Sequence, residues 1–83
     1  MNNKVIWITG ASSGIGKALA IKFANKGWHV AVSARRENLL KELSEKYSNI
    51  HTFPLDVTDS VKCKTISVEI LNKLKNIEIC VFC

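Results

Sequence analysis

The sequence predicts an α/β fold built on a parallel β-sheet. Short apolar runs alternate along the chain with longer segments in which apolar residues recur every three or four positions, which is typical of strands alternating with amphipathic helices. The strand-like runs are almost wholly apolar, as expected of strands that are buried on both faces. With 83 residues, of which 47% are hydrophobic and 23% charged, the chain has the size and composition of one globular domain.

Glycines delimit the first strand and the first helix. Residues 5–9 form an apolar run that ends at Gly10. Residues 15–26 are predicted to form a helix that ends at Gly27, because glycine readily takes the left-handed conformation at a helix C-terminus. The apolar residues expected to face the sheet recur every four positions, at Ile15, Leu19 and Phe23.

The middle of the chain contains a second strand, a second helix and a third strand. A β-rich run covers residues 29–34, and residues 37–47 form an amphipathic pattern with three leucines and Tyr47 on one side. Residues 50–55 are predicted to form the third strand. Pro54 lacks an N–H group for the sheet, so this strand is expected at the sheet edge.

The last predicted elements are a helix over residues 60–75 and a strand from Ile77 to Phe82. Asp59 or Ser60 is expected to cap the N-terminus of this helix. Its inward side is expected to carry Val61, Ile66, Ile70 and Leu74.

The order βαβαβαβ predicts how these elements assemble. Parallel strands need crossover connections, and such crossovers are right-handed, so we expect an open four-stranded parallel sheet of order 3-2-1-4 with helices on both faces. Residues 1–83 would then form a partial Rossmann-type domain. Residues 77–82 would be an exposed apolar edge that pairs with another chain or aggregates. We therefore expect a truncated domain, as a fragment or a frameshift remnant, with a genuine short protein as the alternative.

A glycine-rich turn joins the first strand to the first helix, with the sequence Thr9-Gly10-Ala11-Ser12-Ser13-Gly14-Ile15-Gly16. Gly10 allows a sharp turn, Gly14 removes bulk where a diphosphate must approach the backbone, and Gly16 allows the helix to pack closely on the sheet. The helix N-terminus then presents free amides to the phosphates. The alternative is a plain tight turn that binds nothing, because a glycine pattern alone is a weak signal.

Two arginines follow the second strand, in the run Ala34-Arg35-Arg36. Domains that bind NAD place an acidic residue here for the ribose 2′-hydroxyl. In this sequence Ala34 replaces the acid, and a guanidinium can bind a 2′-phosphate through charge-assisted hydrogen bonds. The pattern therefore predicts NADP(H) in preference to NAD(H). The alternative is that both arginines are solvated loop charges.

Asp56 follows the third strand, at the edge of the sheet where open α/β folds bind their ligands. Its carboxylate could accept a hydrogen bond from the amino group of adenine. An Asx turn that leads into the next helix is an equally good interpretation.

Together these residues resemble the short-chain dehydrogenase/reductase family, over the whole chain and about the first third of an ordinary member. The family's T-G-x-x-x-G-x-G turn and the Asp-Val pair after strand three are both matched, the latter at Asp56 and Val57. The resemblance implies an oxidoreductase that transfers hydride between NADP(H) and a carbonyl or alcohol. It implies these cofactor-binding residues: Gly10, Ser12, Ser13, Gly14, Ile15, Gly16, Arg35, Arg36, Asp56 and Val57.

The resemblance also implies that the chain carries no catalytic residue. The family's N-N-A-G turn, its serine and its Tyr-x-x-x-Lys pair have no counterpart here, and Tyr47 is expected to be a packing residue. We therefore expect no substrate site and no reductase turnover from this chain alone. The alternatives are a stand-alone dinucleotide-binding or subunit-association module and a non-functional gene remnant.

Composition disfavours other classes of function. The net charge of +5 comes from scattered lysines, which argues against a nucleic-acid partner. No secretory signal is present and no apolar run approaches the ~20 residues that span a bilayer, so we expect a cytoplasmic protein with no membrane partner. Cys80 and Cys83 lack the further ligands of a zinc site and the following helix of a redox pair, and no metal is expected.

Overall fold

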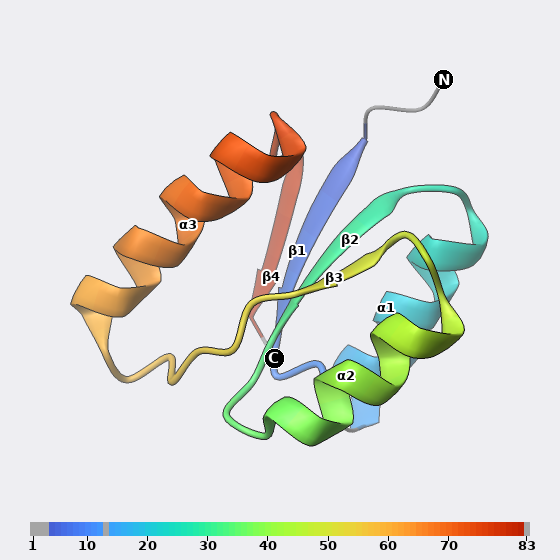
Figure 1. Ribbon diagram of the computed structural model, residues 1–83, viewed down its shortest axis with the longest axis horizontal. Coiled ribbons are helices and arrows are strands. Elements are labelled where there is room, and N and C mark those ends of the chain that lie inside the picture. Colours follow the sequence, from blue (N-terminus) through green and yellow to red (C-terminus); the bar gives the residue numbers. More distant parts are fainter. Residues whose placement is uncertain (1–3, 13, 83) are drawn as a thin grey trace.

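The structure, a computed structural model, describes residues 4–12 and 14–82. Within these residues, strands and helices alternate in the predicted order βαβαβαβ (Figure 1). In chain order the elements are β1 (Val5–Thr9), α1 (Gly14–Asn25), β2 (His29–Ser33), α2 (Glu37–Lys46), β3 (Ile50–Thr52), α3 (Ser60–Leu74) and β4 (Ile79–Phe82).

The strands form one parallel sheet in the order β3-β2-β1-β4, which confirms the predicted Rossmann-type topology. The central strands pair from Val5 opposite His29 to Thr9 opposite Ser33. Because Thr9 and Ser33 lie side by side, the glycine-rich turn and the two arginines leave the sheet from neighbouring points. The sheet topology alone thus brings together two segments that lie about twenty residues apart in the sequence.

Helices cover both faces of the sheet, with α1 and α2 on one face and α3 on the other (Figure 1). Side chains alternate along a strand, so each strand contributes to both cores. The core under α1 and α2 contains the even-numbered strand residues Ile6, Ile8, Val30 and Val32. The core under α3 contains Val5, Trp7 and Ala31, which pack with Ile66 and Ile70 of α3.

The predicted inward face of α1 is wrong at Ile15, whereas Leu19 and Phe23 pack against the core beside Ala20 and Ala24, which the sequence placed next to them. Ile15 is 79% exposed, and the buried residues of the helix are Gly16, Ala20 and Ala24. Leu19 and Phe23 flank this line and are only partly buried. The physical reason is size, because glycine and alanine let the helix lie close to the sheet and therefore occupy the line of contact.

The predicted inward face of α3 is correct at Ile66 and Ile70 but wrong at Val61, which is 75% exposed. Val61 and Ile66 are five positions apart, which places the two side chains about 140° apart around a helix of 3.6 residues per turn. Of the two predicted caps, Asp59 is the one observed. Its side chain accepts a hydrogen bond from the N–H of Lys62 at 3.1 Å.

Three strands are shorter than predicted, and the first of them, β2, ends at Ser33, one residue before its predicted end. β3 is an edge strand as expected, but it ends at Thr52, so Pro54 lies beyond it. The chain still follows β2 after that point, because the N–H of Phe53 bonds the carbonyl of Val32 at 2.9 Å. β4 begins at Ile79 rather than Ile77 and forms the other edge of the sheet, with Phe82 69% exposed.

Candidate functional site

The glycine-rich turn has the backbone that its glycines were expected to provide. Gly10 and Gly14 have φ angles of 69° and 59°, in the left-handed region that residues with a Cβ rarely adopt. At Gly16 a Cβ would run into the carbonyl oxygen of Gly10 and would approach the Gly10 carbonyl carbon to 2.9 Å and the Cα of Ala11 to 3.1 Å. The missing Cβ of Gly16 therefore allows α1 to pack directly against the turn.

The opposite side of the turn is open. A Cβ built on Gly14 would meet no atom within 4 Å. Gly14 also begins α1, whose first N–H groups have no partner within the helix and carry the positive end of the helix dipole. Ser12 is partly buried, Ile15 is exposed, and the predicted site residue Ser13 lies outside the described residues. The turn therefore offers amides and open space together, as an anion-binding loop requires.

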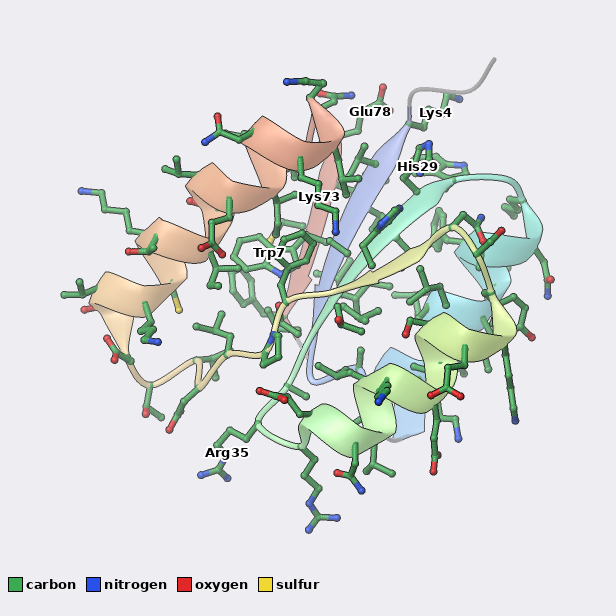
Figure 2. All side chains as sticks on the ribbon, viewed as in Figure 1. Lys4, Trp7, His29, Arg35, Lys73 and Glu78 are labelled. Carbon is green, nitrogen blue, oxygen red and sulfur yellow. The ribbon has the colours of Figure 1, made fainter. Side chains whose placement is uncertain are left out.

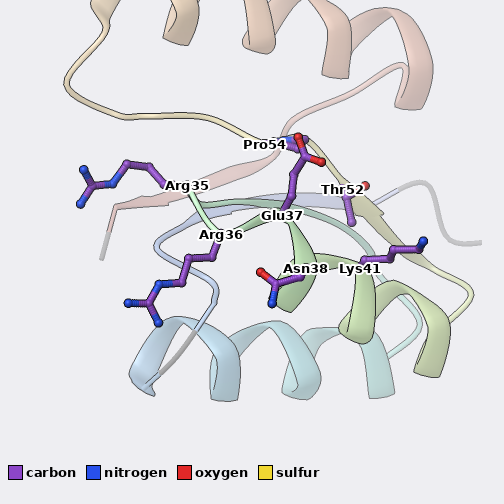
Figure 3. A pocket seen from close by; sticks show the side chains of 7 residues that line it. All are labelled: Arg35, Arg36, Glu37, Asn38, Lys41, Thr52 and Pro54. Atoms are coloured by element: carbon purple, nitrogen blue, oxygen red, sulfur yellow. The ribbon is translucent and has the colours of Figure 1, made fainter.

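Arg35 and Arg36 follow β2 after one intervening residue, Ala34, and both are exposed. Figure 3 shows both side chains extending outward from the end of β2, away from Thr52 and Lys41. Arg36 also occupies the N-cap position of α2 and makes no side-chain cap hydrogen bond. The first turn of α2 thus adds its unpaired N–H groups to the two guanidinium charges, opposed by the carboxylate of Glu37.

A cavity of about 410 Å³ joins the turn, the end of β2 and the segment after β3. Its size falls within the range of about 300–1,000 Å³ that is usual for small-molecule sites. It is lined by Gly10, Ser12, Ala34, Arg35, Arg36, Leu55, Asp56, Val57 and Thr58. Six of these nine residues were predicted as cofactor-binding from the sequence, and the cavity brings them to one place.

A second, larger cavity of about 710 Å³ lies on the other side of the arginines, between α2 and β3 (Figure 3). It shares Arg35 and Arg36 with the first cavity but includes no residue of the glycine-rich turn. A dinucleotide needs the turn and the arginines together. The smaller cavity is therefore the candidate site, although the other one is larger.

Asp56 forms the Asx turn that was one of its two interpretations. Its Oδ1 accepts hydrogen bonds from the N–H of Thr58 at 3.0 Å and from the Thr58 hydroxyl at 2.7 Å. The hydroxyl bond is the main cause that lowers the pKa of Asp56, followed by the N–H bond, and the charge of Arg35 contributes a smaller effect. Both bonds end on Oδ1, so Oδ2 is not used by them. Asp56 can therefore form the Asx turn through Oδ1 and still accept a hydrogen bond from a ligand through Oδ2.

Tyr47 and Cys80, which the sequence analysis considered for other roles, do not line this cavity. Tyr47 caps the C-terminus of α2 and packs against the core, consistent with its predicted packing role. Cys80 lies on β4, where burial raises the pKa of its thiol, and Cys83 lies outside the described residues. In the part of the chain that the structure describes, no group of three metal-ligating side chains and no helix able to cross a membrane was found.

Sequence reasoning missed two side-chain pairs. Trp7 and Ser33 form a buried hydrogen bond of 2.9 Å beside the site. At the opposite end of β2, Nδ1 of His29 and Nε2 of His51 lie 3.2 Å apart. Each pair joins adjacent strands, so only the strand register could have revealed it. The sequence carries no local signal for either pair.

The burial of His51 should make the stability of the fold depend on pH. Burial, then the charge of Lys73, then His29 lower the pKa of His51 from its ordinary value of 6.5. The unfolded chain therefore takes up the proton at a higher pH than the folded one, so the free energy of unfolding should fall as the pH is lowered through about 6.5. Urea denaturation should show a shallower decrease in His51→Gln and a partly reduced one in Lys73→Gln. An unchanged slope in His51→Gln would contradict this assignment.

Comparison with known proteins gives one consistent result. The family model for short chain dehydrogenases matches residues 4–83. Sulfoacetaldehyde reductase 2 from Chromohalobacter salexigens is 36% identical over 77 residues, which is 89% of this chain and 31% of that protein. 11-beta-hydroxysteroid dehydrogenase B from Sesamum indicum is 38% identical over 77 residues, which is 87% of this chain and 21% of that protein.

Solved structures agree with the sequence comparison. A short chain dehydrogenase from Bacillus anthracis superposes with a TM-score of 0.91 at 30% identity, covering 98% of this chain and 34% of that chain. A short-chain dehydrogenase from Streptomyces avermitilis gives a TM-score of 0.91 at 31% identity, covering 96% and 30%. The chain thus spans about a third, or less, of the length of these relatives.

Proposed function

The chain belongs to the short-chain dehydrogenase family, and from this premise we propose that it holds the adenosine diphosphate end of NADP(H) in an oxidoreductase acting on a carbonyl or alcohol. One observation carries the proposal. A single cavity is lined by Gly10 and Ser12 of the glycine-rich turn, by Arg35 and Arg36, and by Asp56. Those are the three groups that a 2′-phosphorylated adenine dinucleotide needs.

The turn is the proposed diphosphate site. The space beside Gly14 lets phosphate oxygens approach the backbone, and the amides at the start of α1 can donate to them. Larger residues at Gly10 or Gly14 would strain the left-handed backbone. The open geometry supports binding in preference to the alternative of a plain tight turn.

Arg35 is the proposed ligand of the 2′-phosphate, with Arg36 beside it. Ala34 is only 7% exposed and carries no carboxylate, so nothing at that position would repel the extra phosphate or bind a free 2′-hydroxyl. A guanidinium can make two parallel hydrogen bonds to phosphate. Both arginines are exposed and line the cavity, which leaves them accessible to a ligand.

The segment after β3 is the proposed adenine site. Oδ2 of Asp56 would accept from the adenine amino group, while Oδ1 keeps the turn through Thr58. Val57, which is 49% exposed, offers an apolar surface for the base. When bound, the cofactor supplies hydride transfer at its nicotinamide ring. The residues of this chain bind and orient its other end.

A pair of ligands without nicotinamide tests the proposal on the adenosine site alone. ADP-ribose and 2′-phospho-ADP-ribose differ by one phosphate, so their dissociation constants measured by calorimetry isolate its contribution. The phosphorylated ligand should bind about 10-fold tighter or more at low salt, since hydrogen bonds to charged groups are the strong ones. The preference should shrink as salt screens the phosphate. Equal affinities would refute the NADP(H) assignment.

A further inference from the structure

A buried hydrogen bond lies beside the candidate site and is not explained by ligand contact. The indole Nε1 of Trp7 donates to the hydroxyl of Ser33 at 2.9 Å. Trp7 is 5% exposed and Ser33 is fully buried, so neither group can turn to water. Figure 2 shows Trp7 between the sheet and α3, which agrees with its place in the core under that helix.

Ser33 connects the segments that form the site. Its hydroxyl is tied to Trp7 on β1, and its main-chain carbonyl accepts the N–H of Ala11 in the glycine-rich turn at 3.3 Å. The next carbonyl, of Ala34, accepts the N–H of Leu55 at 3.1 Å, just before Asp56. Arg35 is the next residue after Ala34. Ser33 and Ala34 thus join the proposed sites of the diphosphate, the 2′-phosphate and adenine.

Stability alone does not require this polar pair. If apolar side chains replaced both Trp7 and Ser33, no buried polar group would be left without a partner. Such a replacement of both partners of a buried hydrogen bond can be nearly neutral for stability. Breaking the bond while both residues stay buried is unfavourable, because the indole N–H and the hydroxyl would then have neither each other nor water as a hydrogen-bond partner. The bond therefore favours one position of the end of β2 over its alternatives.

We propose that Trp7 and Ser33 are positioning residues that fix the spacing between the glycine-rich turn and Arg35, and thereby the selection of NADP(H). The inference rests on the function proposed above, with the diphosphate at the turn and the 2′-phosphate at Arg35. A ligand that uses both sites needs the correct spacing between them. A ligand without the 2′-phosphate uses the turn and the adenine site but makes no phosphate contact to Arg35, so it tolerates a displaced Arg35.

The matched variants Ser33→Thr and Ser33→Val separate position from packing. Both add similar bulk in the core, but only threonine keeps the hydroxyl. Ser33→Val should raise the dissociation constant of 2′-phospho-ADP-ribose about 5- to 10-fold relative to Ser33→Thr. The constant for ADP-ribose should differ less than about twofold between them. Equal ratios of the two constants in both variants would overturn the proposal.

Trp7→Phe tests the other partner and decides the outcome if the Ser33 variants fail to fold. It removes the donor, keeps an aromatic ring and should reproduce the selective loss of 2′-phospho-ADP-ribose. A wild-type ratio of affinities in Trp7→Phe, or equal weakening of both ligands, would instead assign the pair a purely structural role. If the wild-type protein itself binds both ligands equally, the proposed function fails, and the positioning role fails with it. If the wild type discriminates and the variants do so equally well, only the positioning role fails.

Discussion

Exchange of Arg35 for alanine should weaken binding of NADP(H) about 10- to 100-fold and leave NAD(H) within about twofold, because charge-assisted bonds to a phosphate are lost from one ligand only. The side chain leaves the end of β2 directly beside Ala34, where an acidic residue would otherwise read the ribose. Its guanidinium also lines the cavity that contains Gly10 and Asp56. Dissociation constants for both cofactors, measured at low salt by calorimetry, give the result.

Arg36→Ala is the matched control. It removes the same charge from the adjacent position, but Arg36 is the N-cap of α2 and its backbone carbonyl is engaged by the N–H of Leu40. We expect a loss of only a few-fold for NADP(H), from weaker long-range attraction, and this loss should disappear at high salt. If Arg36→Ala weakened NADP(H) binding more than Arg35→Ala, Arg36 rather than Arg35 would be the ligand of the 2′-phosphate. Equal losses for NADP(H) and NAD(H) in Arg35→Ala would remove the 2′-phosphate contact altogether.

The parts of this molecule that could be predicted from sequence are those set by local residue patterns. The apolar runs identified every strand, and the turn glycines identified where α1 meets the sheet. The arginines and Asp56 could be placed at the ligand edge because parallel strands all end at the same edge. Topology then brought six predicted site residues to one cavity, although the residues that line its remaining wall, such as Leu55 and Thr58, were not foreseen.

The features that could not be predicted depend on how elements meet in space. The inward face of α1 was misassigned because close packing favours Gly16, Ala20 and Ala24 over the more apolar Ile15. The Trp7–Ser33 bond depends on the register of β1 against β2. No composition or spacing rule gives that register in advance, since side chains of many kinds fit a buried strand. The unforeseen Trp7–Ser33 bond thus lies behind the site, whereas six of the predicted residues, among them Gly10, Arg35 and Asp56, line the cavity itself.

Gly16→Ala should lower the free energy of unfolding by about 1–3 kcal/mol. The added Cβ would overlap the carbonyl oxygen of Gly10 and crowd its carbonyl carbon at 2.9 Å. These are backbone atoms, so no side-chain rotation can relieve the contact. Alanine is otherwise the better helix former by about 1 kcal/mol, which makes a destabilising result a specific sign of the clash. Urea denaturation measures the change.

Gly14→Ala is the internal control, because its Cβ would enter open space and cause strain only through the φ angle of 59°. It should lower the free energy of unfolding by less than Gly16→Ala, by about 1–2 kcal/mol for a left-handed residue. It should nevertheless weaken the binding of both NADP(H) and NAD(H), because its methyl group would lie in the proposed path of the diphosphate. Gly16→Ala displaces α1 from the turn and should weaken both cofactors as well, through lost stability and displaced amides together. If Gly16→Ala left both the free energy of unfolding and the cofactor affinity unchanged, the backbone of the turn could move to accommodate the methyl group without affecting either. Close packing of α1 would then not be what holds the amides toward the diphosphate.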